Sequence, residues 1–411
     1  MSHPRISEFP VEEPGVSIQN KHRHASSLPL RIFAVCLTSV VTAAQYTNYG
    51  PLIPVLQANL HINSGQAGLL STFLFLGLAV MYIPAGILSD RYGSRPVLIG
   101  SSILFTVAGI LLPLFANFFW ILACRAMIGF GIGAAFVAGA RTASNMGKHA
   151  PLGQGLYGGS VQIGSGLGLL VTPFLLTAFG WRGTFLFWGL LGIASIAAWL
   201  FIDDGEEAHE PVRADVMAGV RSPAVWTLGL SHMGTFGLGN ALAAWIAVYL
   251  AHQYGFSLTL AATLGSLALL TGMFFRPLGG ILLSRRVIGA IPLLRIGTIM
   301  ASSGVALLAI PLRFPLLVIA GMALIAIGAT IPYTSVFNEA AHLRGVSKGI
   351  AQALASVISI PTVILGPPLI GLLFELTGSF TPAFGSILLF GCIAITASFL
   401  AGSAVRRETT W

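Results

Sequence analysis

The long apolar runs of this sequence decide what it can fold into. Only 8% of the 411 residues are charged, against about a quarter in soluble domains, so the chain lacks the solvated groups to cover a water-soluble surface. A helix that crosses a bilayer needs about 20 mostly apolar residues. Twelve such runs occur, at 31–55, 66–88, 96–115, 117–140, 153–178, 182–202, 222–250, 258–284, 289–311, 314–339, 348–374 and 380–403. We therefore predict an all-α membrane protein with twelve transmembrane helices, which excludes a cytosolic enzyme of ordinary domains.

The positions of lysine and arginine predict the orientation in the membrane. Cytoplasmic segments of membrane proteins are enriched in both residues. With the N-terminus in the cytoplasm, most of the 21 Lys and Arg fall on the inner side, whereas Arg182 and Arg313 lie outside and Arg125 and Arg276 fall within spans. We expect a multi-pass protein of the inner (cytoplasmic) membrane with both termini in the cytoplasm. The net charge of +8 is then an orientation signal, and no nucleic-acid partner is expected.

A polar break in the middle of the chain predicts two halves. The expected organisation is a cytoplasmic tail at 1–30, a six-helix bundle at 31–202, a cytoplasmic linker at 203–221, a second six-helix bundle at 222–403 and a tail at 404–411. The first 30 residues lead into an apolar run without a cleavage site of small residues, so we interpret them as a retained tail. The three cysteines lie in apolar runs without metal-type spacing, so no disulfide, metal or cofactor is predicted. We expect a monomer.

A short motif recurs at matching positions of the two halves. Gly86-Ile87-Leu88 lies at the end of the second span, before the third, and Gly280-Ile281-Leu282 lies at the end of the eighth, before the ninth, which indicates duplication. The first copy extends to G-x-L-x-D-R-x-G-x-R and resembles the signature loop of the major facilitator superfamily; the matching residues are Gly86, Leu88, Asp90, Arg91, Gly93 and Arg95. Arg125 with the glycines that follow it in span four is similar to the same family. The resemblance covers the whole chain and implies secondary transport by alternating access, with two bundles rocking about a site near the membrane midplane.

The signature loop is predicted to form a cytoplasmic gate. Asp90 can cap a neighbouring helix or pair with Arg91 and Arg95, while Gly86 and Gly93 permit a tight turn and close approach. The second copy has Ser284 in place of the carboxylate, followed by Arg285, so we expect a weaker latch there. The alternative is a charged loop that only fixes the topology.

Two arginines within spans are candidate substrate-binding residues, because an intramembrane arginine is costly unless it faces a cavity or a partner. Arg125 resembles the span-four arginine of the superfamily, which is often linked to proton coupling. Its alternative role is structural, as a donor to neighbouring carbonyls. Arg276 lies nine residues before Arg285, about 13 Å along a helix, which is deep for a surface anchor. For Arg276 a structural or gating role, or snorkelling to the inner headgroups, stays open.

The surroundings of Arg276 point to an anion. Arg276-Pro277-Leu278-Gly279-Gly280 resembles the span-eight segment of oxalate–formate exchangers, monocarboxylate transporters and nitrate/nitrite porters, where the arginine binds the substrate anion. The planar guanidinium suits carboxylate and nitrate because it offers parallel hydrogen bonds. Nitrate porters carry a second arginine where this chain has Tyr82, and oxalate exchangers carry a lysine in span eleven, whereas 349–374 contains no Lys or Arg. One cationic group favours a monovalent anion.

Other polar residues at mid-depth are predicted to line the central cavity: Gln45, Asn48 and Tyr49 in span one, Gln162 in span five, and His232 and Asn240 in span seven. None of the 13 acidic residues falls in mid-membrane. A coupling proton would therefore travel on His232, on a carboxylate at a span end, or with the anion itself. The alternative for His232 is a hydrogen-bonded packing role. Pro361, Pro367 and Pro368 are expected to kink or hinge span eleven.

The leading interpretation is a secondary transporter for a small anionic solute, coupled to a proton or to exchange. The alternative transporter is an exporter of neutral or amphipathic compounds. A membrane-embedded enzyme is excluded because no metal-binding histidine pair, nucleophile elbow or phosphate-binding loop occurs. A transporter-like sensor is a third class, although its tails would carry no signalling domain.

Overall fold

The computed structural model describes residues 26–146, 149–203, 216–311 and 314–409, which form helices joined by short loops, without any strand. Eleven helical segments are long and apolar enough to cross a membrane. One of them, Gly153–Phe201, has 49 residues, and Gly180 interrupts it with φ 65° and ψ 179°. Because a left-handed φ breaks the helix there, this segment supplies two crossings, and the predicted twelve spans are confirmed.

The first half contains spans one to six. Its helices are α1 (Leu28–Thr47), α2 (Ile53–Leu60), α3 (Ser64–Tyr92), α4 (Ser94–Leu111), α5 (Phe118–Ser144), α6 (Ala150–Leu190) and α7 (Gly192–Phe201). Close packing of small residues holds this half together. A Cβ on Gly164 of α6 would lie 2.2 Å from the carbonyl oxygen of Val40 in α1, and one on Gly168 would lie 2.4 Å from that of Ala44. Glycine at these positions lets the two helix backbones approach closely.

The second half contains spans seven to twelve. Its helices are α8 (Val216–Arg221), α9 (Pro223–His232), α10 (Leu238–Tyr254), α11 (Leu258–Leu270), α12 (Gly272–Ser284), α13 (Ala290–Ala309), α14 (Pro315–Thr330), α15 (Tyr333–Ala341), α16 (Lys348–Ser359), α17 (Pro361–Thr377) and α18 (Phe380–Thr409). Some boundaries differ from the expectation: α8 is a helix inside the predicted linker, and α18 continues into the predicted C-terminal tail. Helix α1 begins at Leu28, inside the predicted N-terminal tail, and residues 1–25 of that tail and 204–215 of the predicted linker lie outside the described residues.

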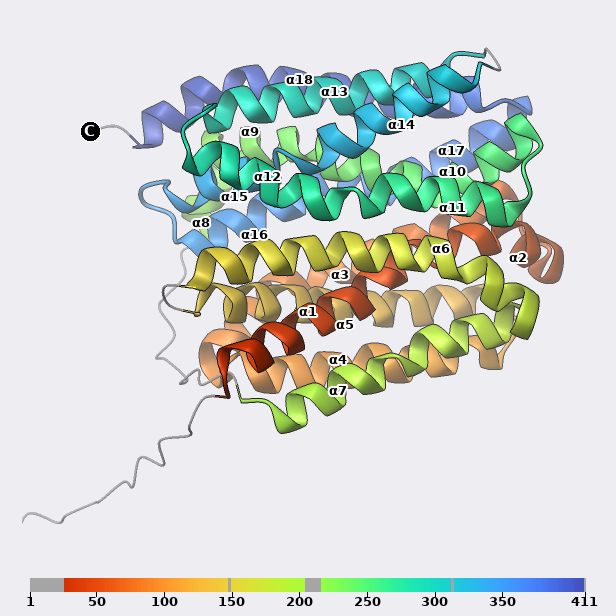
Figure 1. The fold of residues 1–411 in the computed structure, drawn as a ribbon, viewed down its shortest axis with the longest axis horizontal. Coiled ribbons are helices and arrows are strands. Elements are labelled where there is room, and N and C mark those ends of the chain that lie inside the picture. Colours follow the sequence, from red (N-terminus) through yellow and green to blue (C-terminus); the bar gives the residue numbers. More distant parts are fainter. Residues whose placement is uncertain (1–25, 147–148, 204–215, 312–313, 410–411) are drawn as a thin grey trace, which may run out of the picture.

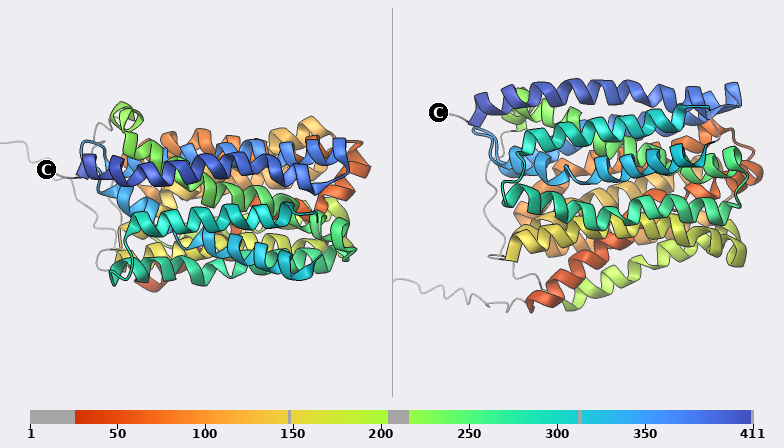
Figure 2. Two further views of the ribbon diagram at one scale, coloured as in Figure 1. Left: turned by 90° about the horizontal axis from the view of Figure 1, so that it is seen from above. Right: turned by 45° about the horizontal axis from the view of Figure 1, so that its top comes forward.

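The two halves lie side by side, with α1–α7 below and α9–α18 above in Figure 1. The helices of both halves run between the same two ends of the molecule (Figure 2). The described chain ends and the residues on either side of the linker all lie at the left of Figure 1. We call this end of the molecule the linker end, and the end at the right of Figure 1 the opposite end. Helix α6 runs beside α11 and α12, and a Cβ on Gly166 would touch the Leu270 side chain at 2.5 Å.

Four spans of the second half are interrupted near mid-length. In span seven a π-helical segment, Met233–Gly237, separates α9 from α10. Span eight breaks at Thr271, span ten at Ile331–Pro332, and span eleven at Ile360. The break before Pro361 agrees with the expected kink, whereas Pro367 and Pro368 lie inside the continuous helix α17. Such interruptions within a membrane are tolerated where protein or a cavity surrounds them. A cavity is therefore to be sought at this depth of the molecule.

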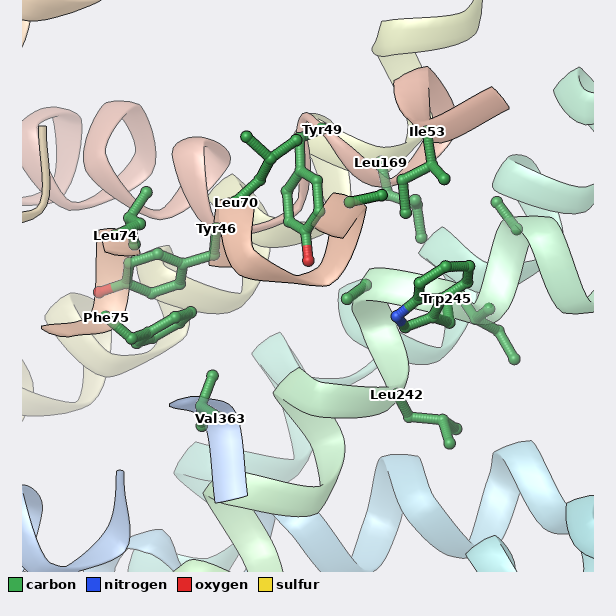
Figure 3. Close-up of a cluster of buried hydrophobic side chains, with 14 of the residues drawn as sticks. Tyr46, Tyr49, Ile53, Leu70, Leu74, Phe75, Leu169, Leu242, Trp245 and Val363 are labelled. Atoms are coloured by element: carbon green, nitrogen blue, oxygen red, sulfur yellow. The ribbon is translucent and has the colours of Figure 1, made fainter. Parts of the chain in front are cut away.

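Toward the opposite end, the halves are sealed together. A cluster of buried apolar side chains crosses from Tyr46, Leu70 and Phe75 in the first half to Trp245 and Val363 in the second (Figure 3). Large rings packed without gaps exclude water. This cluster separates the middle of the molecule from the opposite end.

A line of contacts between α3 and α17 completes the seal, and we call it the α3–α17 seam. At its outer limit Ser64, the first residue of α3, donates from its N and its Oγ to Oε2 of Glu375 over 3.2 and 2.7 Å. One turn further, a Cβ on Gly68 would lie 2.4 Å from the nitrogen of Pro368. Another turn on, Thr72 Oγ1 donates to the carbonyl oxygen of Ile364 over 2.5 Å.

Candidate functional site

A small cavity lies between the halves at the depth of the helix breaks. It measures about 20 Å³, room for one or two water molecules. Its lining comes from both halves: Tyr46, Tyr82, Phe136 and Val161 from the first, and His232, Phe236, Arg276, Tyr333, Phe337, Ser356 and Ser359 from the second. Among these lining residues there is no Asp or Glu. The cavity therefore holds a cationic group in a largely aromatic surround without an acidic counter-charge.

Arg276 is the cationic group of this cavity. Its side chain is only 6% exposed, and Nη1 donates to the carbonyl oxygen of Gly158 in α6 over 2.9 Å. The guanidinium carbon lies 4.2 Å from the centre of the Tyr333 ring, within the range of a cation–π contact. The buried Nε has no hydrogen-bond partner. Arg276 thus lies between the halves rather than at a headgroup surface.

Local sequence explains this placement. A Cβ on Gly279 of α12 would come within 2.0 Å of the carbonyl oxygen of Ile331, so glycine permits α12 to pack directly on the break in span ten. Because α15 begins just after Pro332, its first residue is Tyr333, and the close approach of α12 brings the guanidinium of Arg276 over that ring. The break in span ten and the glycine that packs on it together position the arginine.

His232 also lines the cavity. Its Nδ1 lies 3.0 Å from Thr235 Oγ1, and the same hydroxyl donates to the carbonyl oxygen of His232 over 3.1 Å. The tautomer of the ring decides which of the two atoms, Nδ1 or Oγ1, donates in this contact. The ring is stacked on Phe236 and meets Phe337 edge-on, both at 5.5 Å between centroids. The π-helical segment that follows holds this arrangement, as π-bulges at functional sites often do.

Arg125 lies elsewhere, buried inside the first half with 0% exposure. Its Nε donates to the carbonyl oxygen of Leu70 over 3.1 Å. Its Nη1 donates to the carbonyl oxygen of Gln45 over 3.1 Å and to Oδ1 of Asn48 over 3.3 Å. Its guanidinium carbon lies 5.0 Å from the centre of the Tyr49 ring. The structure thus groups three of the residues predicted in span one with Arg125, away from the cavity around Arg276.

Two other predicted residues lie beside the cavity without lining it. The Nε2 atom of Gln162 packs against Gly272, where a Cβ would lie 2.6 Å away. Asn240 donates from Nδ2 to the carbonyl oxygen of Phe236 over 2.9 Å, within its own helix.

The residues predicted as a gate lie at the linker end. Arg95 donates from Nε to the carbonyl oxygen of Trp199 in α7 over 2.9 Å and from Nη1 to Oδ2 of Asp203, just after α7, over 3.0 Å. The guanidinium of Arg91 lies 5.2 Å from the centre of the Tyr92 ring. Gly93 has a φ of 82°, as the predicted turn requires, and Gly86 has open space around its Cα hydrogen. Arg285 is exposed directly after α12, and the Asp90 side chain lies outside the described part.

Sequence reasoning missed three tyrosines of the cavity: Tyr46, Tyr82 and Tyr333. A signal was present, because tyrosine in membrane proteins is enriched at the two interfaces rather than at mid-depth. All three fall well inside predicted spans.

The two-bundle fold and the cavity between the bundles are those of a membrane carrier. The chain matches the sequence profile of the Major Facilitator Superfamily over residues 35–362, and it belongs to that superfamily. It is similar in structure to a bacterial homologue of the human lysosomal transporter Spinster, solved in an inward-facing, occupied conformation, with a TM-score of 0.76 and 17% identity over 94% of this chain and 100% of that one.

Two relatives found by sequence comparison are described as transporters of particular solutes. The chain is 29% identical to a chloroplastic ascorbate transporter of Arabidopsis thaliana over 59% of its own length and 49% of that protein. It is 26% identical to a nitrite extrusion protein of Bacillus subtilis over 56% of its own length and 59% of that protein. The matched segments thus span about half the length of these relatives.

Proposed function

We propose that this protein is a secondary transporter that moves a small monovalent anion across the membrane by alternating access, with Arg276 as the anion-binding group. The observation that carries the proposal is the buried guanidinium between the halves. A cation in a cavity without a carboxylate is unfavourable unless a ligand or water compensates its charge. An anion supplies that compensation, and the donor that Arg276 gives to Gly158 of the other half links binding to the contact between halves.

The charge of the substrate follows from the count of cations in the cavity. Arg276 is the one Arg or Lys among its lining residues, and a second negative charge would be buried without a partner. The relatives named for ascorbate and nitrite support a monovalent anion, since both solutes carry one negative charge at neutral pH. The chain encloses the cavity by itself, which supports action as a monomer.

We further propose that the linker end faces the cytoplasm of a cell whose inner membrane holds the protein. The support is the excess of Lys and Arg on that side. In this orientation the α3–α17 seam closes the outer side, and the predicted gate residues around Arg91 and Arg95 would close the inner side in the alternate state. A proton is the proposed coupling ion, with His232 as the titratable group that lines the cavity.

The test is uptake into proteoliposomes of radiolabelled formate, nitrite, nitrate, lactate, pyruvate and ascorbate, with and without an imposed pH gradient. We expect Arg276→Gln to abolish uptake and Arg276→Lys to reduce it, because lysine keeps the charge but not the planar fork. Arg295→Gln is the matched control, since Arg295 packs on the Phe399 ring at 4.2 Å, away from the cavity. Anion uptake that survives Arg276→Gln would overturn the proposal, and uptake of neutral compounds alone would favour the exporter.

A further inference from the structure

Three phenol groups around the cavity lack a protein acceptor. Tyr46 and Tyr82 are 5% and 4% exposed, and no hydrogen bond from the hydroxyl of either, or of Tyr333, is found to another described residue. Tyr157, which packs on the cavity residue Phe136, behaves differently, because its hydroxyl donates to the carbonyl oxygen of Phe136 over 2.9 Å. Buried hydroxyls are usually paired, so the three at the cavity call for an acceptor inside it.

No hydrogen bond joins these phenols to the remaining polar groups of the lining. The hydroxyls of Ser356 and Ser359 donate to carbonyl oxygens of their own helix over 2.9 and 2.6 Å. Arg276 contributes only donors, and its buried Nε is unpaired. The guanidinium and the three phenols thus offer more donors than the His232 ring and the two serine oxygens can accept from, and a ligand that brings acceptor oxygens of its own would pair the rest.

The donors come from both halves. Tyr46 and Tyr82 belong to α1 and α3 of the first half, whereas Arg276 and Tyr333 belong to α12 and α15 of the second. We infer that the Tyr46 and Tyr82 hydroxyls bind the oxygens of an anion held by Arg276, so that a small planar oxyanion bridges the two halves. This inference rests on the proposed function and adds to it the binding groups of the first half and the shape of the substrate.

The size of the cavity limits that shape. Its volume of about 20 Å³ fits one or two water molecules, so the smallest oxyanions, such as formate, nitrite and nitrate, need the least displacement of the wall. Rings form most of the remaining wall, and their flat faces suit a planar ion. A larger anion such as ascorbate would have to displace Phe136, Phe236 or Phe337, at the cost of packing that the small ion keeps.

The neutral phenols also explain the preference for one charge. Each phenol donates a hydrogen bond to an anionic oxygen without adding a positive charge, so the first half strengthens binding of a single negative charge and offers no counter-ion for a second. An anion that contacts both halves stabilises the arrangement in which they are close together.

The experiment is titration calorimetry on the full-length protein in nanodiscs, with formate, nitrite, nitrate, pyruvate and ascorbate as probes. The variants are Tyr46→Phe, Tyr82→Phe and their combination, which remove only the hydroxyl. We expect each single change to raise the Kd for nitrite or formate about tenfold, as for a hydrogen bond to a charged group. Tyr157→Phe is the matched control, because it loses a hydroxyl beside the cavity that already has a partner, and its Kd should stay within about twofold of the wild type.

The outcomes separate this inference from the proposed function. If the wild type binds small anions and Arg276→Gln abolishes binding, but both phenylalanine variants bind like the wild type, the inference is overturned and the transporter proposal stands. If ascorbate or pyruvate binds more tightly than nitrite and formate, the size limit is wrong. If Arg276→Gln leaves binding unchanged, the proposed function itself fails.

Discussion

Replacing Thr72 by valine should open the opposite end of the molecule. Thr72 Oγ1 donates to the carbonyl oxygen of Ile364, and in a regular helix that carbonyl would accept from the N–H of residue 368. Residue 368 is proline, which has no N–H. The bond from the first half therefore replaces the one that the helix cannot make. Valine has the shape of threonine without the donor, so Thr72→Val leaves the carbonyl unpaired only while the seam is closed.

The magnitude follows from that asymmetry. A buried acceptor without a partner costs about 1–3 kcal/mol, whereas in the open state the same carbonyl can be hydrated. The closed state alone bears the cost, so the ratio of closed to open molecules should fall by about 5- to 150-fold. Thr177→Val is the matched control, because Thr177 donates to the carbonyl oxygen of Pro173 in its own helix over 3.0 Å and crosses no interface.

The assay is electron–electron double resonance between spin labels at Asn59 and Leu376, after the native cysteines are replaced. Asn59 is exposed in the first half, and Leu376 is 71% exposed in the second, both toward the opposite end. We expect a longer-distance population in Thr72→Val that the control lacks. Pro368→Ala restores the missing N–H and should weaken the effect of Thr72→Val. An equal effect of Thr72→Val in both backgrounds would refute the role assigned to the freed carbonyl.

Two further predictions concern packing. Gly68→Ala places a Cβ 2.4 Å from backbone atoms of the α17 prolines, so we expect it to prevent closure of the α3–α17 seam. Uptake should be lost, and the distance between the two spin labels should stay long. Normal uptake would show that α17 shifts to accommodate the methyl group. Arg125→Met removes the donors to the carbonyl oxygens of Leu70 and Gln45 and should lower the melting temperature in detergent by several degrees, an effect measured by static light scattering that Arg295→Gln should not share.

The spans were predictable because their signal is length and apolar content, which do not depend on neighbours. The break at Gly180 was also within reach of sequence, since Gly180 stands between two runs and is followed by Trp181 and Arg182. The second half's broken helices were only partly foreseen. Pro361 marks one break, but the same residue type at Pro367 and Pro368 leaves α17 continuous. Thr72 of α3 takes the carbonyl oxygen of Ile364 that Pro368 frees.

The rotation of span one shows why the candidate site was harder to predict. Gln45 and Tyr49 lie four residues apart and share a face, which the structure turns toward Arg125, whereas Tyr46 is turned by about 100° toward the cavity. Both faces carry polar groups, so hydropathy does not tell them apart. Only tertiary contacts decide which face meets the other half, and Arg276 was found because its charge is unusual at any rotation.

The interruptions at Met233–Gly237, Thr271, Pro332 and Ile360 divide four spans of the second half into shorter helices that meet near mid-length. A helix bends most readily where its ladder of hydrogen bonds is already broken. The helices toward the linker end and those toward the opposite end can therefore tilt independently. One end of the molecule can then open while the other keeps its contacts. Motion of this kind would make the depth of the helix breaks a shared hinge. The first half, whose helices α3 and α5 are longer and unbroken, would stay rigid while the second half moves against it.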